Sequence, residues 1–82
     1  MSGGHFDYAQ FRIDEIAREV DHLISGELYE YGFSEETIEE FRTGLNLLRR
    51  AAVYAQRIDW LVSGDDGEET FHERLAKDLK AI

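Results

Sequence analysis

The chain has 82 residues, without cysteine or proline, and its 18 acidic and 9 basic residues give a formal net charge of −9. The missing cysteines exclude disulfides and thiolate metal sites, and the acidic balance argues against direct binding to nucleic acid, whose phosphates require lysine and arginine. The length predicts one small domain, which is only marginally stable without further support.

A first helix is predicted over residues 7–25. Asp7 and Gln10 have the spacing of a capping box, and Gly26 is placed to end the helix in a left-handed conformation. Phe11 projects to the side opposite the apolar stripe, where it is either an ordinary exposed aromatic residue or part of a second packing surface. The stripe predicted to face the core consists of Ala9, Ile13, Ile16, Ala17, Val20, Leu23 and Ile24.

The connector at residues 27–33 contains three aromatic residues, which predicts that it packs back onto the core. Ser34 is a favourable N-cap for a second helix, because glutamates follow it in the first turn and interact favourably with the helix dipole. Phe33 and Ile38 flank this cap at the spacing of a hydrophobic staple. These features predict that the second helix begins at residue 35.

Residues 35–62 are predicted to form one long helix around which the chain is organised. It would be roughly 42 Å long at 1.5 Å per residue, longer than a compact domain of this size is wide. Two apolar stripes cover more than half of its circumference, so it needs two neighbours, from this chain or from a second copy. One stripe contains Ile38, Phe41, Leu45, Leu48, Ala52, Ala55 and Val62; the other contains Gly44, Leu47, Ala51, Tyr54, Ile58 and Leu61.

Asp59 falls within the first stripe, one turn from Ala55 and from Val62. A carboxylate in this position must be paired or hydrogen-bonded if it is buried. We therefore expect Asp59 to be a structural buried acid, with a ligand or catalytic role as the alternative. Its expected partners are backbone donors at the start of a third helix or an arginine from another element: Arg12, Arg18 or Arg74.

Four arginines follow four glutamates along the long helix, an order that matches the helix dipole. Arg42 and Arg49, and likewise Arg50 and Arg57, lie seven residues apart and form two adjacent rows. The simplest interpretation is a solvated face with salt bridges. Because guanidinium groups bind phosphates well, the alternative is a nucleotide site at an oligomer interface, formed by Arg49, Arg50, Tyr54 and Arg57.

A third helix is predicted over residues 67–80. Gly64 is placed to end the long helix, and Asp66 and Glu69 have the spacing of a capping box for the next one. The third helix should fold back beside the end of the second through its single apolar stripe of Phe71, Leu75, Leu79 and Ile82.

The acidic residues do not form a convincing metal site. Residues 65–69 match a calcium loop poorly, because apolar and hydroxyl residues occupy ligand positions. The acidic cluster Glu35–Glu40 is similar to that of the all-helical nucleoside triphosphate pyrophosphohydrolases, but Gln56 stands where their second acidic pair is required. We therefore expect no cofactor and no enzymatic activity, with a magnesium-dependent nucleotide pyrophosphohydrolase as the less favoured alternative.

Residues 52–75, AVYAQRIDWLVSGDDGEETFHERL, resemble a set of small proteins of tailed bacteriophages and prophages. Residues 5–8, HFDY, are similar to the opening of those proteins, so the resemblance covers most of the chain. It implies a phage origin and an accessory role, and it carries over no catalytic residues. Small phage proteins of this kind often act by binding, either to a host defence or replication protein or to a signalling nucleotide.

Together these observations predict an all-α fold of three antiparallel helices with a long central helix, assembled into a homodimer or a higher oligomeric bundle. No signal peptide, long apolar run or lipidation motif is visible, so we expect a cytoplasmic protein, in the host cell if phage-encoded, that does not bind membranes. The expected function is to modulate or inhibit a host protein, with a sponge for a signalling nucleotide as the alternative. The expected partner surface, which would occupy a basic groove, consists of Phe11, Glu15, Glu19, Glu36, Glu39 and Glu40.

Overall fold

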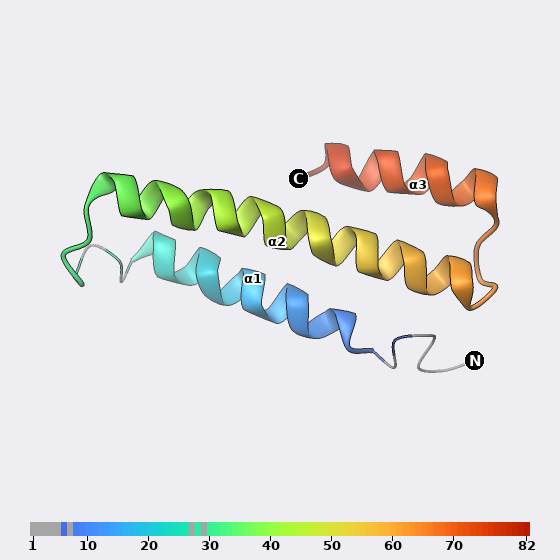
Figure 1. Cartoon of the computed structure of the whole chain (residues 1–82), viewed down its shortest axis with the longest axis horizontal. Coiled ribbons are helices and arrows are strands. Elements are labelled where there is room, and N and C mark those ends of the chain that lie inside the picture. The colour runs from blue at the N-terminus through green and yellow to red at the C-terminus, as the bar shows by residue number, and fades with distance from the viewer. Residues whose placement is uncertain (1–5, 7, 27, 29) are drawn as a thin grey trace.

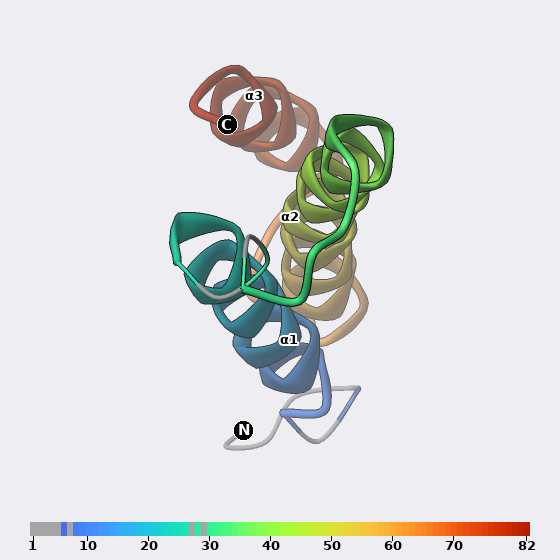
Figure 2. The ribbon, with the colours of Figure 1, turned by 90° about the vertical axis from the view of Figure 1, so that its left-hand side faces the viewer.

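The computed structural model describes residues 6, 8–26, 28 and 30–82 (Figure 1). In these residues it is all-helical, without strands, and contains α1 (Gln10–Ser25), α2 (Glu35–Val62) and α3 (Glu68–Lys80). The chain turns back after α1 and again after α2, so that α2 lies between the other two helices. Figure 2, along the long axis, shows α1 and α3 displaced to the same side of α2, so that the helices form a shallow trough.

The three helices form one thin layer. The molecule measures 47 × 24 × 13 Å. Its radius of gyration is 15.4 Å, whereas a compact chain of this length has about 12 Å. Its accessible surface is 5938 Å², compared with about 5,000 Å² for a typical folded monomer of this mass. Domains normally pack two layers around a core, whereas this single layer of described residues has no second layer on either face.

The core lies mainly between α1 and α2. Ala17 of α1 and Ile38 of α2 are almost completely buried. Leu45, two turns further along α2, is also buried. Ile38 and Leu45 of the first apolar stripe of α2 thus meet α1, as their spacing predicts, whereas Val62 at the end of that stripe is 54% exposed. Ile16 was expected in the core and is instead 53% exposed, because α1 packs on α2 through a narrower strip than its apolar residues cover.

The ends of α1 differ from the prediction. The helix begins at Gln10, and Ala9 precedes it without a side-chain cap; Asp7 of the predicted capping box lies outside the described residues. The predicted left-handed cap at Gly26 is wrong, because its φ is −148°. Its N–H instead bonds to the carbonyl of Leu23 at 3.3 Å and closes a tight last turn, which does not require positive φ.

The connection between α1 and α2 packs differently from the prediction. Leu28 is its buried residue, whereas Tyr31 and Phe33 are 63% and 45% exposed and Tyr29 lies outside the described residues. The Phe33 ring stacks between Tyr31, at 5.5 Å, and Phe41, at 6.2 Å between centroids. The aromatic rings therefore lie on the surface, because the single leucine fills the space at this end of the core.

The start of α2 and the turn after it follow local rules. The Ser34 hydroxyl accepts a hydrogen bond from the Thr37 N–H at 3.3 Å, which confirms the predicted N-cap. At the other end Gly64 has a φ of +86°, and the next N–H, of Asp65, bonds back to the carbonyl of Trp60 at 2.9 Å. This is the glycine-ended helix that the sequence predicts.

The cap of α3 differs from the predicted Asp66–Glu69 box. Gly67 is the N-cap residue, and the Thr70 hydroxyl accepts its N–H at 3.1 Å. The same hydroxyl donates to the Asp66 carboxylate. Asp66 therefore precedes the cap and supports it through Thr70, because the chain enters the helix one residue later than a capping box on Asp66 requires.

Candidate functional site

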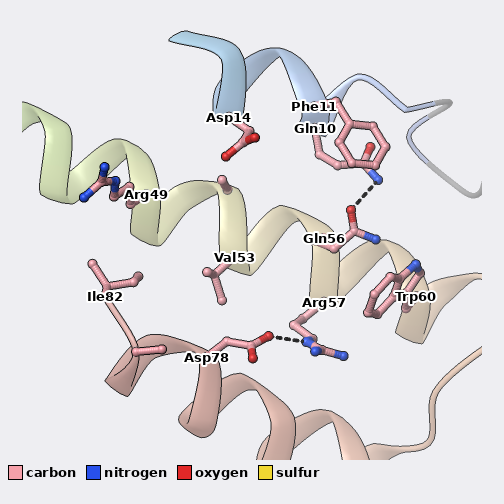
Figure 3. A pocket seen from close by; sticks show the side chains of 12 residues that line it. Gln10, Phe11, Asp14, Arg49, Val53, Gln56, Arg57, Trp60, Asp78 and Ile82 are labelled. Carbon is pink, nitrogen blue, oxygen red and sulfur yellow. Dashed lines mark hydrogen bonds and ion pairs between the residues drawn. The ribbon is translucent and has the colours of Figure 1, made fainter. Parts of the chain in front are cut away.

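A groove lies on the concave side of the layer, with α2 as its floor and α1 and α3 as its walls (Figure 3). Its volume is about 490 Å³. Val53 and Trp60 of α2 belong to the floor, Phe11 to the α1 wall and Asp78 to the α3 wall. The groove thus combines residues that are up to 72 positions apart in the chain, Gln10 and Ile82.

Arg57 connects α2 to α3 inside this groove (Figure 3). Its Nε donates to the Asp78 carboxylate at 2.8 Å, and its guanidinium lies 4.7 Å from the ring centroid of Trp60. A terminal nitrogen lies 4.0 Å from Asp66, whose side chain is 2% exposed. The Arg57 side chain is itself only 14% exposed. Because Arg57 bonds to Asp78 of α3 and approaches Asp66 before it, Arg57 primarily fixes α3 on α2.

Asp66 anchors the turn between α2 and α3. Besides the Thr70 hydroxyl, it accepts Nη1 of Arg74 at 3.3 Å. Two arginines from different helices, Arg57 and Arg74, therefore converge on one buried carboxylate. The two guanidinium groups offset the buried charge, although Asp66 Oδ2 accepts no hydrogen bond from the described residues, and they tie the turn to both helices.

Asp59 is 3% exposed, and its carboxylate joins the far end of α2 to the beginning of α1. It accepts the Phe6 N–H at 2.9 Å and the Gln10 side-chain amide at 3.2 Å. Gln10, 4% exposed, also donates to the amide oxygen of Gln56 at 3.2 Å (Figure 3). These contacts support a structural role for Asp59.

The donors to Asp59 are not the expected ones. Of the candidate arginines, Arg18 pairs with Asp14 at 2.6 Å and Arg74 with Asp66. The expected backbone donors at the start of α3 are replaced by the N–H of Phe6 at the opposite end of the chain. The reason is that Asp59 lies on the side of α2 that Gln10 of α1 contacts, whereas Figure 2 shows α3 at another position around α2.

The four residues of the predicted nucleotide site are not brought together. Arg49 and Arg57 line the groove, whereas Arg50 and Tyr54 are exposed and do not line it. Arg49 pairs with Asp21 of α1 at 3.3 Å, and both side chains are about half exposed. Trp60, which lines the groove, was not predicted as a site residue. A local signal for it was the polar residue Gln56, which lies one helical turn before Trp60 and also lines the groove.

The predicted partner surface is also divided. Glu15 and Glu19 each lie two positions from buried Ala17, and therefore about 200° around α1 from it. Glu36 and Glu40 have the same relation to buried Ile38 on α2. The two pairs thus point away from the α1–α2 contact, in opposite directions.

The two remaining residues of that surface have other neighbours. Glu39 pairs with Arg42 at 2.9 Å. Phe11 is 50% exposed and borders the groove, and its ring stacks on Tyr8 at 5.9 Å. The six residues therefore do not form one continuous surface.

Comparison of the chain with family models, with curated proteins and with solved structures gives no match. Within the described residues, no three histidine, aspartate or glutamate side chains are grouped so as to hold a metal ion. None of the described helices combines the length and apolar character needed to cross a bilayer.

Proposed function

We propose that the protein is a non-enzymatic binding protein that modulates a basic host protein in the host cytoplasm. The observation that carries this proposal is that α3 does not cover the first half of α2. Figure 1 shows that α3 extends only along the second half of α2. Glu36 and Glu40 are exposed at the uncovered end, close in the chain to the exposed rings of Tyr31 and Phe33.

Protein interfaces commonly combine aromatic anchor residues with a polar rim. The stacked rings of Tyr31 and Phe33 supply rigid apolar area, and the glutamates supply negative charge. The net charge of −9 would steer a basic partner toward the molecule. The resemblance of residues 52–75 to small phage proteins supports a host defence or replication protein as that partner. The antiparallel three-helix arrangement would serve as the scaffold for this end.

Neutralising and reversing charge at this end should weaken binding of the partner at least tenfold. The variant combines Glu36→Gln with Glu40→Lys, and glutamine is used at position 36 because a lysine in the first turn would oppose the helix dipole. The measurement is quantitative mass spectrometry of the proteins that the tagged chain retains from bacterial lysate. Retention should also fall as salt is raised, because exposed charges are screened.

The matched control makes the same charge change on the opposite edge, with Glu15→Gln and Glu19→Lys. It should retain the partner within a factor of two. Equal loss in both variants would indicate a response to net charge alone, and unchanged retention in the α2 variant would remove this end as the binding surface. Either result would contradict the proposal.

A small anionic ligand, such as a signalling nucleotide, is the second candidate because the groove has a suitable volume and composition. Its volume of about 490 Å³ is in the range of small-molecule sites. The ring of Trp60 is 36% exposed, and Arg49 at the rim is paired only with a half-exposed carboxylate. These groups would stack on a base and pair with a phosphate.

A bound nucleotide should raise the melting temperature of the wild-type protein, because a ligand at a hundred times its Kd stabilises by about 2.7 kcal/mol. Arg49→Ala should remove this shift. The neighbouring substitution Arg50→Ala is the control, since Arg50 does not line the groove. A panel of nucleotides without any shift, or a shift lost only in Arg50→Ala, would rule out this candidate. Arg57 is unsuitable for the test because it holds α3.

A further inference from the structure

An exposed apolar stripe runs along the convex side of α2. Leu47, Tyr54 and Ile58 are 61%, 41% and 37% exposed, and Val62 is 54% exposed. With Ala51 they recur at three- and four-residue steps, so they share one side of the helix. None of these five residues lines the groove. We call them the convex stripe: Leu47, Ala51, Tyr54, Ile58 and Val62.

The other helices of the chain leave this side of α2 open. Figure 2 shows that α1 and α3 are both displaced toward the concave side of α2, away from the convex side. An apolar hollow of about 320 Å³ lies between α1 and α2, lined by Ala9, Ile13 and Ala55 among others. Ala55 lies one turn from Ala51 of the convex stripe. The hollow therefore borders the stripe and is large enough to receive a side chain from a covering surface.

The excess surface of the chain matches what a dimer requires. The accessible surface exceeds that of a typical monomer of this mass by about 900 Å². A stable protein interface buries about 800 Å² on each partner. The layer is only 13 Å thick, and a second layer would give the two-layer packing of ordinary domains.

The composition of the convex stripe favours a permanent partner. It contains no charged residue, and apolar contacts of this kind are typical of obligate homodimers. Among the described residues only Ala17, Leu28, Ile38 and Leu45 are buried apolar residues, so the chain needs its cover whenever it is folded. A second copy of the chain is present whenever the protein is made, whereas a host protein need not be. A second copy is therefore the partner that meets this requirement.

We propose that the convex stripe is the interface of a homodimer, in which α2 packs against α2 of a second copy. In a two-fold symmetric dimer, residues near the middle of the interface contact the same residues of the second copy. Tyr54 is near the middle of the stripe and should therefore face Tyr54 of the second copy. The contact ends before Glu40, which lies on the same side seven residues ahead of Leu47. The glutamate end of α2 thus remains free, so the dimer and the proposed host binding are tested separately.

The first test is the molar mass by light scattering at micromolar concentration. Wild-type protein should have twice the mass of the chain, and Leu47→Glu with Ile58→Glu should raise the dimer dissociation constant at least a hundredfold. Phe11→Glu is the control, because Phe11 is equally exposed but borders the groove. A monomeric wild type would overturn the proposal, and so would a dimer that dissociates in Phe11→Glu but persists in the stripe variant.

The second test does not require a dissociated chain to remain folded. The natural sequence has no cysteine, so a single introduced thiol reports its own distance to the second copy. Tyr54→Cys should be cross-linked almost completely by a short bismaleimide, which tolerates more separation than disulfide geometry does. Glu19→Cys, on the outer edge of α1, should remain uncross-linked. Cross-linking through position 19 without cross-linking through position 54 would overturn the proposal.

Discussion

Replacing Asp59 by alanine is expected to lower the free energy of unfolding by about 3 kcal/mol, because hydrogen bonds to charged groups contribute about 1.5–3 kcal/mol each. The carboxylate is 3% exposed and accepts hydrogen bonds from Phe6 and Gln10. Alanine removes the carboxylate acceptor and leaves the Phe6 N–H and the Gln10 amide without this hydrogen-bond partner. Since they belong to the beginning of the chain, the loss should loosen the contact between α1 and the second half of α2.

Urea unfolding followed by circular dichroism measures this loss. All variants must be compared at one protein concentration, because association adds to the apparent stability. Asp59→Asn keeps the shape and one acceptor, so it should lose about half as much. Asp65→Ala, in the exposed turn, should change the free energy by less than about 0.5 kcal/mol. An unchanged midpoint in Asp59→Ala would contradict the structural role and favour a ligand role.

A double-mutant cycle with Gln10→Ala tests the partner itself. If the Gln10 amide and the Asp59 carboxylate are partners, the two substitutions should couple by about 1 kcal/mol. Additive effects would assign the stabilisation to other contacts of Asp59.

Arg57→Ala is expected to detach α3 and to lower the free energy of unfolding by about 2 kcal/mol, because it breaks a charge-assisted bond and leaves a carboxylate less compensated. Arg57 bonds to Asp78, approaches Asp66 and lies over Trp60. Its removal therefore affects the turn and α3 together. The contacts between α1 and α2 do not involve it, so they should persist.

Hydrogen exchange resolved by helix is the decisive measurement, because local opening differs from global unfolding. Protection should be lost in α3 of Arg57→Ala and retained in α1 and in the first half of α2. Arg57→Lys keeps the charge but not the planar fork, and should be intermediate. Arg74→Ala removes an arginine that is 54% exposed and bonded to the same Asp66, so its effect should be small. Uniform loss of protection would contradict the specific attachment of α3.

The three helices and several of their ends follow from local sequence signals. Ser34 and Gly64 mark ends of α2 because their effects act within a few residues of backbone. The spacing of apolar residues likewise identified the stripe that meets α1. Asp59 was recognised as a buried acid because a charge within such a stripe is informative without knowledge of its neighbours.

The tertiary structure alone decided how the segments are placed around α2. Gln10 lies 49 positions from Asp59 in the chain, and no local pattern relates two such residues. The division of Arg49 and Arg57 from Arg50 and Tyr54 follows from the angular positions of α1 and α3 on α2. Those angular positions result from packing between distant segments. The connections between the helices do not fix where α1 and α3 lie around α2. The same packing leaves Leu47, Ala51, Tyr54 and Ile58 of the second apolar stripe exposed, although they are as regularly spaced as the residues that α1 buries.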